Sequence, residues 1–183
     1  MGRSQQIILA ELTRVFSAGE LLGQARFVDE VAEAPKIVCI GAGRVGLAMA
    51  GFAKRLSHLG KDAFNYNDIT LPALGPGDLA VFGSGSGETE SIVCLAHIAK
   101  SLGLRLALVT SAPRSRLASL SDSIVVLDCA NKLDPTAAGG SVQPMTSLFE
   151  QASQVFLDGA VLDLMSVLGV SEDDMRRRHN AIE

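Results

Sequence analysis

The fold is decided by one stretch, Lys36-Ile37-Val38-Cys39-Ile40-Gly41-Ala42-Gly43-Arg44-Val45-Gly46, in which a glycine-rich loop follows a short apolar run. Apolar runs of this length that contain β-branched residues are typical of strands buried on both faces. The loop leads into an apolar pattern that predicts a helix ending near His58 and Leu59, with Gly60 after it. A strand, a glycine loop and a helix in this order predict the first unit of a parallel sheet.

The same alternation continues along the chain. Short apolar runs predict further strands at residues 63–66, 79–82, 106–109 and 124–127, and a helix ending at Leu102 follows the second of these. Strands joined by short helical crossovers favour a doubly wound sheet. We therefore expect an α/β fold of three layers, with a five-stranded parallel sheet in the flavodoxin-like order 2-1-3-4-5.

Helices are predicted at both ends of the chain. Apolar stripes at helical spacing predict helices at about residues 6–18 and 20–32, and a long one from Ser147 to Leu168. Ser171 and Asp174 have the spacing of a capping box that begins a last short helix. We expect the helices within residues 5–33 and 147–180 to pack on one domain that spans residues 1–183.

Composition narrows the class of protein. The chain has 183 residues, 48% hydrophobic and 20% charged, which excludes a disordered chain. The formal net charge of −4 leaves no basic footprint for nucleic acid. No apolar run approaches the roughly 18 residues that span a membrane. Cys39, Cys94 and Cys129 are scattered without metal-ligand spacing, so the sequence predicts reduced cysteines, no metal site and a cytoplasmic protein.

The first glycine loop, residues 41–46, allows two interpretations. It matches the pattern G-x-G-x-x-G between a strand and a helix, which dinucleotide-binding proteins follow with an acidic residue about 20 positions later. Asp68 lies at a suitable distance, whereas Asp62 precedes the second predicted strand. An NAD-dependent oxidoreductase and a tight turn with closely packed glycines both remain open on this loop alone.

A second loop, Ser84-Gly85-Ser86-Gly87-Glu88-Thr89, favours a phosphate ligand. Its three hydroxyls and its backbone N–H groups precede a helix, where an anion with several oxygens is stabilised. The competing interpretation is an ordinary capped helix start. In the expected strand order the first and third strands are neighbours, so both loops border one crevice at their carboxyl ends. The sequence predicts a small phosphorylated ligand that spans them.

Several motifs resemble those of a known family. The second loop is similar to the Ser-x-Ser-Gly-Glu-Thr signature of sugar isomerase (SIS) domains, which bind phosphosugars. Residues 141–151, the run Phe156-Leu157-Asp158 and the ending Arg178-His179-Asn180 resemble the 6-phospho-3-hexuloisomerase branch. The resemblance covers almost the whole chain.

The resemblance implies an activity and an assembly. Members of this branch interconvert D-arabino-hex-3-ulose 6-phosphate and D-fructose 6-phosphate, in the ribulose monophosphate pathway of formaldehyde metabolism. They need no metal or nucleotide cofactor and usually form homotetramers. We expect the same here, with sites near subunit interfaces. An isomerase for another sugar phosphate and a non-catalytic sugar-phosphate-binding module are the alternatives.

The resemblance also implies catalytic residues. Glu150 matches the family's base, which moves a proton between neighbouring carbons. The residues alone favour another role for Glu150, because Ser147 and Glu150 have capping-box spacing. His58 lies about 14 residues beyond the first loop, roughly 21 Å along a straight helix, so we expect it to serve a neighbouring subunit's site. His179 is a candidate from the chain's end. The competing interpretations are that His58 is stabilised by the dipole at a helix C-terminus and that His179 belongs to a solvated helix end.

The remaining predicted site residues bind the substrate or its phosphate: Gly43, Arg44, Ser84, Ser86, Gly87, Glu88 and Thr89. The chain departs from the family pattern at two positions in the same region. Val45 stands where the family usually has a serine that helps to hold the ligand. Thr146 stands where it usually has a glycine, so we expect less backbone freedom beside the predicted base.

Overall fold

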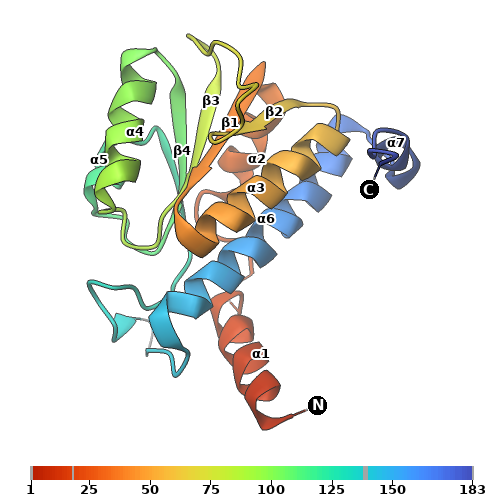
Figure 1. Ribbon diagram of the computed structural model, residues 1–183. Coiled ribbons are helices and arrows are strands. Elements are labelled where there is room, and N and C mark those ends of the chain that lie inside the picture. Colours follow the sequence, from red (N-terminus) through yellow and green to blue (C-terminus); the bar gives the residue numbers. More distant parts are fainter. Residues whose placement is uncertain (1, 18, 138–139, 183) are drawn as a thin grey trace.

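An all-parallel sheet of five strands forms the centre of the computed structural model, which describes residues 2–17, 19–137 and 140–182 (Figure 1). The strand order is β2-β1-β3-β4-β5, which confirms the predicted order 2-1-3-4-5. Each of the four neighbouring pairs is parallel. The strands are β1 (Lys36–Gly41), β2 (Asp62–Asn65), β3 (Leu79–Gly83), β4 (Arg105–Thr110) and β5 (Ser123–Val126).

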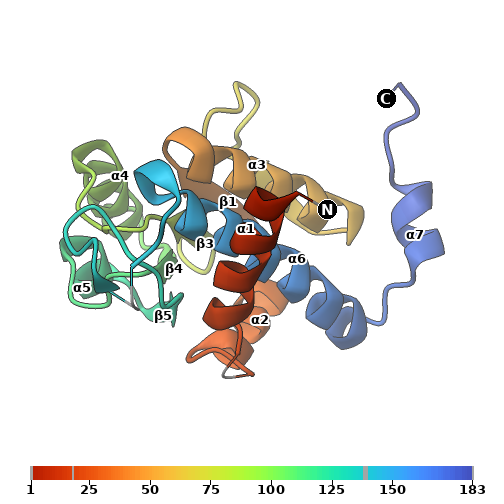
Figure 2. The same ribbon diagram turned by 90° about the horizontal axis from the view of Figure 1, so that it is seen from below.

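Helices cover both faces of the sheet and make the fold three-layered (Figures 1 and 2). One face carries α2 (Gln24–Glu33), α3 (Gly43–His58) and α6 (Ser147–Leu168), and the other carries α4 (Glu90–Ser101) and the short α5 (Arg116–Leu120). Alternate residues of a strand enter different cores. Ile37 and Cys39 of β1 pack toward α3, whereas Val38 and Ile40 pack toward α4. Both faces are buried, which is why the strands are apolar throughout.

The terminal helices lie outside this sandwich. Helix α1 (Arg3–Val15) contacts α6 and extends away from the sheet. Helix α7 (Glu172–Arg177) lies at the other end of the molecule, beside the end of α3 (Figure 2). Its predicted capping box is confirmed, because the Ser171 hydroxyl accepts from the Asp174 amide and the Asp174 carboxylate accepts from the Ser171 amide. Within the described residues, no helix combines the length and apolar character needed to cross a bilayer.

Two predicted helix boundaries and one unpredicted helix are the main differences between the sequence-based prediction and the structure. The first helix ends at Val15 and not at residue 18, because hydrogen bonds of the tighter i→i−3 type follow it. The second begins at Gln24, four residues later than predicted. Helix α5 was not predicted, because its five residues are too short for an apolar period. Ser115 begins it by accepting a hydrogen bond from the Ala118 amide.

Candidate active site

A cleft of about 560 Å³ opens at the carboxyl ends of β1 and β3, where the sequence placed the two loops. Three segments form its walls: the glycine loop after β1, the serine loop (residues 84–89) after β3, and the α6 wall (residues 144–150). Of the predicted site residues, six line the cleft: Gly43, Arg44, Ser84, Ser86, Thr89 and Glu150. The fold therefore brings most of the predicted ligand-binding residues together with the predicted base.

The glycine loop is packed too closely to admit larger residues. A Cβ atom on Gly46 would lie 2.6 Å from the carbonyl oxygen of Gly41. Val45 lines the cleft, and its Cγ1 lies so close to β3 that a Cβ on Gly83 would approach it to 2.7 Å. The position at which the family usually has a hydroxyl therefore presents an apolar side chain in this protein.

The serine loop is shaped by its own hydroxyls. The Ser84 hydroxyl accepts from the Gly87 amide at 3.2 Å, and the Ser86 hydroxyl accepts from the Glu88 amide at 3.3 Å. Thr89 is the N-cap of α4, but its side chain forms no capping hydrogen bond. The threonine hydroxyl thus lines the cleft without being used by the helix, which favours the ligand interpretation of this loop over an ordinary cap.

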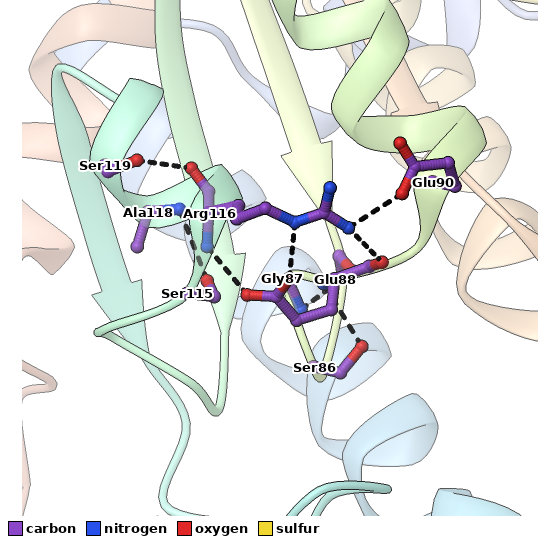
Figure 3. Close-up of polar contacts among 9 residues, drawn as sticks. Ser86, Gly87, Glu88, Glu90, Ser115, Arg116, Ala118 and Ser119 are labelled. Atoms are coloured by element: carbon purple, nitrogen blue, oxygen red, sulfur yellow. Dashed lines mark hydrogen bonds and ion pairs between the residues drawn. The ribbon is translucent and has the colours of Figure 1, made fainter.

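Glu88 points toward Arg116, in the connection after β4 (Figure 3), and is not among the residues that line the cleft. Its carboxylate accepts from the Arg116 amide at 2.8 Å and from Arg116 Nε at 2.6 Å. Arg116 Nη2 also donates to the Glu88 carbonyl and to the Glu90 carboxylate. These hydrogen bonds and the arginine charge lower the pKa of Glu88 below its ordinary value. Glu88 therefore holds the loop in shape and does not line the space a ligand would occupy.

Gly87 likewise faces the connection after β4 and not the cleft. Its φ of +62° is rarely adopted by residues with a side chain, and a Cβ there would lie 2.0 Å from the Ser115 hydroxyl oxygen. Its carbonyl accepts from the Leu117 amide at 3.1 Å. Residues 115–117 thus fix the outer side of the serine loop.

The α6 wall carries Glu150 in the first turn of α6. Arg44 Nη1 lies 2.8 Å from Glu150 Oε2 and donates to the Ser147 hydroxyl at 3.3 Å. The capping-box interpretation of Glu150 is wrong, because the N-cap is Thr146 and its side chain makes no capping bond. The helix begins one residue earlier than that interpretation requires. Glu150 instead turns toward the cleft and the arginine of the opposite loop.

The turn before α6 has an unusual backbone. Met145 and Thr146 both have positive φ values, 55° and 64°. Such values cost a β-branched residue about 1–2 kcal/mol, and they favour glycine. A glycine at position 146 would adopt this conformation without that cost.

His58 and His179 are not in the cleft. They stack on each other with ring centroids 5.0 Å apart, at the end of α3 opposite to the glycine loop. They line a separate cavity of about 360 Å³ together with Lys54, Arg55 and Asp158. Within one copy of the chain, the structure does not bring either histidine to Glu150.

Lys132 is a charged residue that lines the cleft and was not predicted. Lys132 lies in the loop after β5 and is exposed at the cleft. A lone cation in the irregular stretch between the last strand and α6 was the only sequence signal. A lysine at this edge adds positive charge where an anionic ligand would bind.

The two acidic residues considered for binding a dinucleotide, Asp62 and Asp68, do not line the cleft. Asp68 accepts a hydrogen bond from the Asn65 amide at 2.9 Å, within the turn after β2. Asp62 begins β2 and so lies at the opposite edge of the sheet from the cleft. In the described part of the chain, no three His, Cys, Asp or Glu residues are grouped so that they could hold a metal ion.

Two loops at neighbouring strand ends, a helix N-terminus rich in hydroxyls and an Arg–Glu pair define an α/β domain built to bind a small phosphorylated ligand. The chain belongs to the SIS domain family, whose model matches residues 30–152. The matched range contains every strand of the sheet, both loops and Glu150.

The chain is similar over most of its length to named isomerases. It is 37% identical to the 3-hexulose-6-phosphate isomerase of Bacillus subtilis, with 86% of this chain and 85% of that protein covered. It is 30% identical to the 3-hexulose-6-phosphate isomerase of Methylomonas aminofaciens over the whole of both chains. A crystal structure of a Methanococcus jannaschii protein has the same fold, with a TM-score of 0.85, 24% identity and full coverage of both chains.

Proposed function

We propose that this protein is a phosphosugar isomerase that interconverts D-arabino-hex-3-ulose 6-phosphate and D-fructose 6-phosphate through an enediol. The observation that carries the proposal is the shared cleft, in which Glu150 and Arg44 face the serine loop. Relatives that are 30% and 37% identical and are named 3-hexulose-6-phosphate isomerases support this choice of substrate.

The substrate's phosphate binds at the serine loop. Its oxygens accept hydrogen bonds from the hydroxyls of Ser86 and Thr89 and from the amides at the start of α4. Lys132 adds a positive charge at the same cleft. Holding the phosphate at this loop directs the sugar carbons toward Glu150.

Glu150 is the base of the reaction. Its carboxylate removes the proton from C2 of the 3-ketose, and the electron pair of that C–H bond forms the C2–C3 double bond of the enediol. The C3 carbonyl oxygen takes up a proton, and Arg44 stabilises the negative charge that develops on it. Glu150 returns the carbon proton to C3, while the C2 hydroxyl loses its proton and becomes the new carbonyl.

The protons on the oxygens require a second acid–base group. We propose that His58 and His179 supply it to the cleft of a neighbouring copy, in a homotetramer with sites near subunit interfaces. Their stacking at a cavity lined by Lys54 and Arg55 supports this arrangement. Mixing Glu150→Gln subunits with His179→Ala subunits tests it, since restored turnover requires sites built from two chains. Mixed oligomers that stay inactive would refute the arrangement.

The direct test is an isomerase assay on the purified protein. Hexulose 6-phosphate is generated in situ, and fructose 6-phosphate is measured by coupled reduction. Glu150→Gln should lower kcat by about 10³-fold while sugar-phosphate binding persists, because a general base contributes 10²–10⁴-fold. Glu20→Gln, an exposed carboxylate outside the cleft, is the matched control and should leave kcat unchanged.

A second candidate is a non-catalytic module that binds a sugar phosphate. It is favoured by Val45, which stands where the resemblance implies a serine that helps to hold the ligand. The same assay separates the two. Wild-type protein that is stabilised by sugar phosphates but does not turn over hexulose 6-phosphate would point to this module or to an isomerase for another sugar phosphate.

A further inference from the structure

The segment that precedes the α6 wall is held by two side chains of α1, at the other end of the sequence, and Glu11 makes most of the hydrogen bonds. The carboxylate of Glu11, on α1, accepts hydrogen bonds from the Ser141 hydroxyl at 2.7 Å, the Val142 amide at 2.9 Å and the Gln143 side-chain amide at 2.8 Å. Glu11 is 9% exposed, so these bonds replace most of its contact with water.

Arg14 holds the same segment from the same face of α1, and we call Glu11 and Arg14 together the clasp. Its Nη2 donates to the carbonyl of Gly140 at 2.6 Å. Residues three positions apart on a helix lie on one face, so the two side chains can both form hydrogen bonds to residues 140–143. Helix α1 otherwise packs on α6, the helix that carries Glu150.

The position of the clasp along the chain suggests what it is for. Its last bond is to Gln143, and the next three residues, Pro144, Met145 and Thr146, line the cleft. Two of these three have positive φ, and such conformations persist only where the surroundings over-determine them. Proline fixes one φ angle at the entry, and Glu11 fixes the residues before it.

A second buried glutamate shows the difference between this clasp and ordinary structural support. Glu30, on α2, is 8% exposed and is bonded to Arg26 of its own helix and to Ser123 of β5. It ties a helix to the sheet. All hydrogen-bond partners of Glu11 lie instead in three consecutive residues of an irregular segment that leads into the cleft.

We propose that Glu11 is a positioning residue for the isomerase reaction: by fixing residues 141–143 it sets the turn at 144–146 and so the place of Glu150 in the cleft. The inference rests on the proposed function for its catalytic consequence. Glu11 touches neither the cleft nor the serine loop, so it should act on the chemical step and not on phosphate binding.

The test uses the full-length variants Glu11→Ala and Glu11→Gln, with Glu30→Gln as the matched control. Hydrogen–deuterium exchange followed by mass spectrometry should show residues 141–147 of Glu11→Ala exchanging about tenfold faster, with residues 84–89 unchanged. Its kcat should fall about tenfold with KM within twofold, because small misplacements of reacting groups cost 10–100-fold in rate. Glu11→Gln keeps an acceptor for the Val142 amide and should recover part of the loss. Glu30→Gln should lower thermal stability without changing kcat.

Two results would overturn the inference. One is unchanged exchange at residues 141–147 in Glu11→Ala, which counts against the clasp whatever the activity. The other is a kcat in Glu11→Ala that stays within twofold of wild type, or that falls together with a rising KM, while Glu150→Gln is inactive. If wild-type protein does not isomerise hexulose 6-phosphate, the proposed function fails, and the exchange experiment alone decides whether Glu11 positions this wall.

Discussion

The serine loop and the α6 wall face the same cleft, but different parts of the chain hold them. Residues 115–117 fix the serine loop from the next connection of the sheet, about thirty residues along. The α6 wall depends on residues 140–143, which Glu11 and Arg14 hold from about 130 residues away. The loop proposed to bind phosphate is thus supported by the neighbouring strand-to-helix connection of the sandwich, and the wall that carries the proposed base is supported by α1, a helix outside the sandwich. A substitution that removes the support of one segment should therefore leave the shape of the other segment unchanged.

The largest effect on the serine loop is expected from Gly87→Ala. The new Cβ would lie 2.0 Å from the Ser115 hydroxyl oxygen, at a φ of +62° that alanine disfavours. A strain of about 2–3 kcal/mol would distort the loop and raise KM for the sugar phosphate by about 100-fold. Steady-state kinetics and thermal unfolding measure the two effects.

Gly75→Ala is the control for this change. Gly75 has no atoms near its added Cβ and no positive φ, so its KM and stability should stay close to wild type. A Gly87→Ala protein with a normal KM would mean that residues 115–117 do not determine the shape of the serine loop.

Arg116→Ala should have a smaller effect on the same loop. It removes the side-chain bonds to Glu88 and Glu90 but leaves the backbone bonds around Gly87 in place. Exposed ion pairs contribute little to stability, about 0–1 kcal/mol, so unfolding should hardly change. We expect KM to rise about fivefold with kcat unchanged, and Arg114→Ala, an exposed arginine two residues earlier, to have no effect. A lowered kcat in Arg116→Ala would show that the serine loop and the α6 wall are not supported independently.

The same difference explains which features the sequence could predict. The strand order and the cleft followed from consecutive apolar strands and from loops at neighbouring strand ends, and local chemistry determines both. Arg116 and Glu11 were missed because their partners lie 28 and about 130 residues away, and no local pattern records such pairs. Glu150 was assigned as the base only through the family resemblance, since its local spacing indicated a capping role, whereas the N-cap of α6 lies one residue earlier, at Thr146.

Thr146→Gly tests the strain in the α6 wall. Thr146 has a φ of 64°, which glycine adopts readily. The free energy of unfolding should rise by about 1 kcal/mol, since relief of strain outweighs the greater flexibility of glycine in the unfolded chain. Thr70→Gly, at an exposed turn position without positive φ, should instead lower it slightly. Urea unfolding measures both, and a destabilised Thr146→Gly protein would show that this turn is not strained.

The smallest expected effect is a loss of folding stability at low pH through the carboxyl of Glu11. Burial raises the pKa of Glu11, but hydrogen bonds from Gln143, Val142 and Ser141, together with the Arg14 charge, lower it below its ordinary value of 4.5. A carboxyl whose pKa is lower in the folded state stabilises the fold above its unfolded pKa, and this stabilisation is lost as pH falls through the folded value.

Comparing wild type with Glu11→Gln isolates this contribution, because every other carboxyl is present in both proteins. The difference in their free energies of unfolding should be less than about 1 kcal/mol at pH 7 and should shrink further as the pH falls below 4.5. A difference that stays constant over this range would mean that the charge of Glu11 contributes nothing to the clasp. The α6 wall would then be held by the Arg14 hydrogen bond and by the packing of α1 on α6, and its independence from the serine loop would not rest on the charge of this carboxylate.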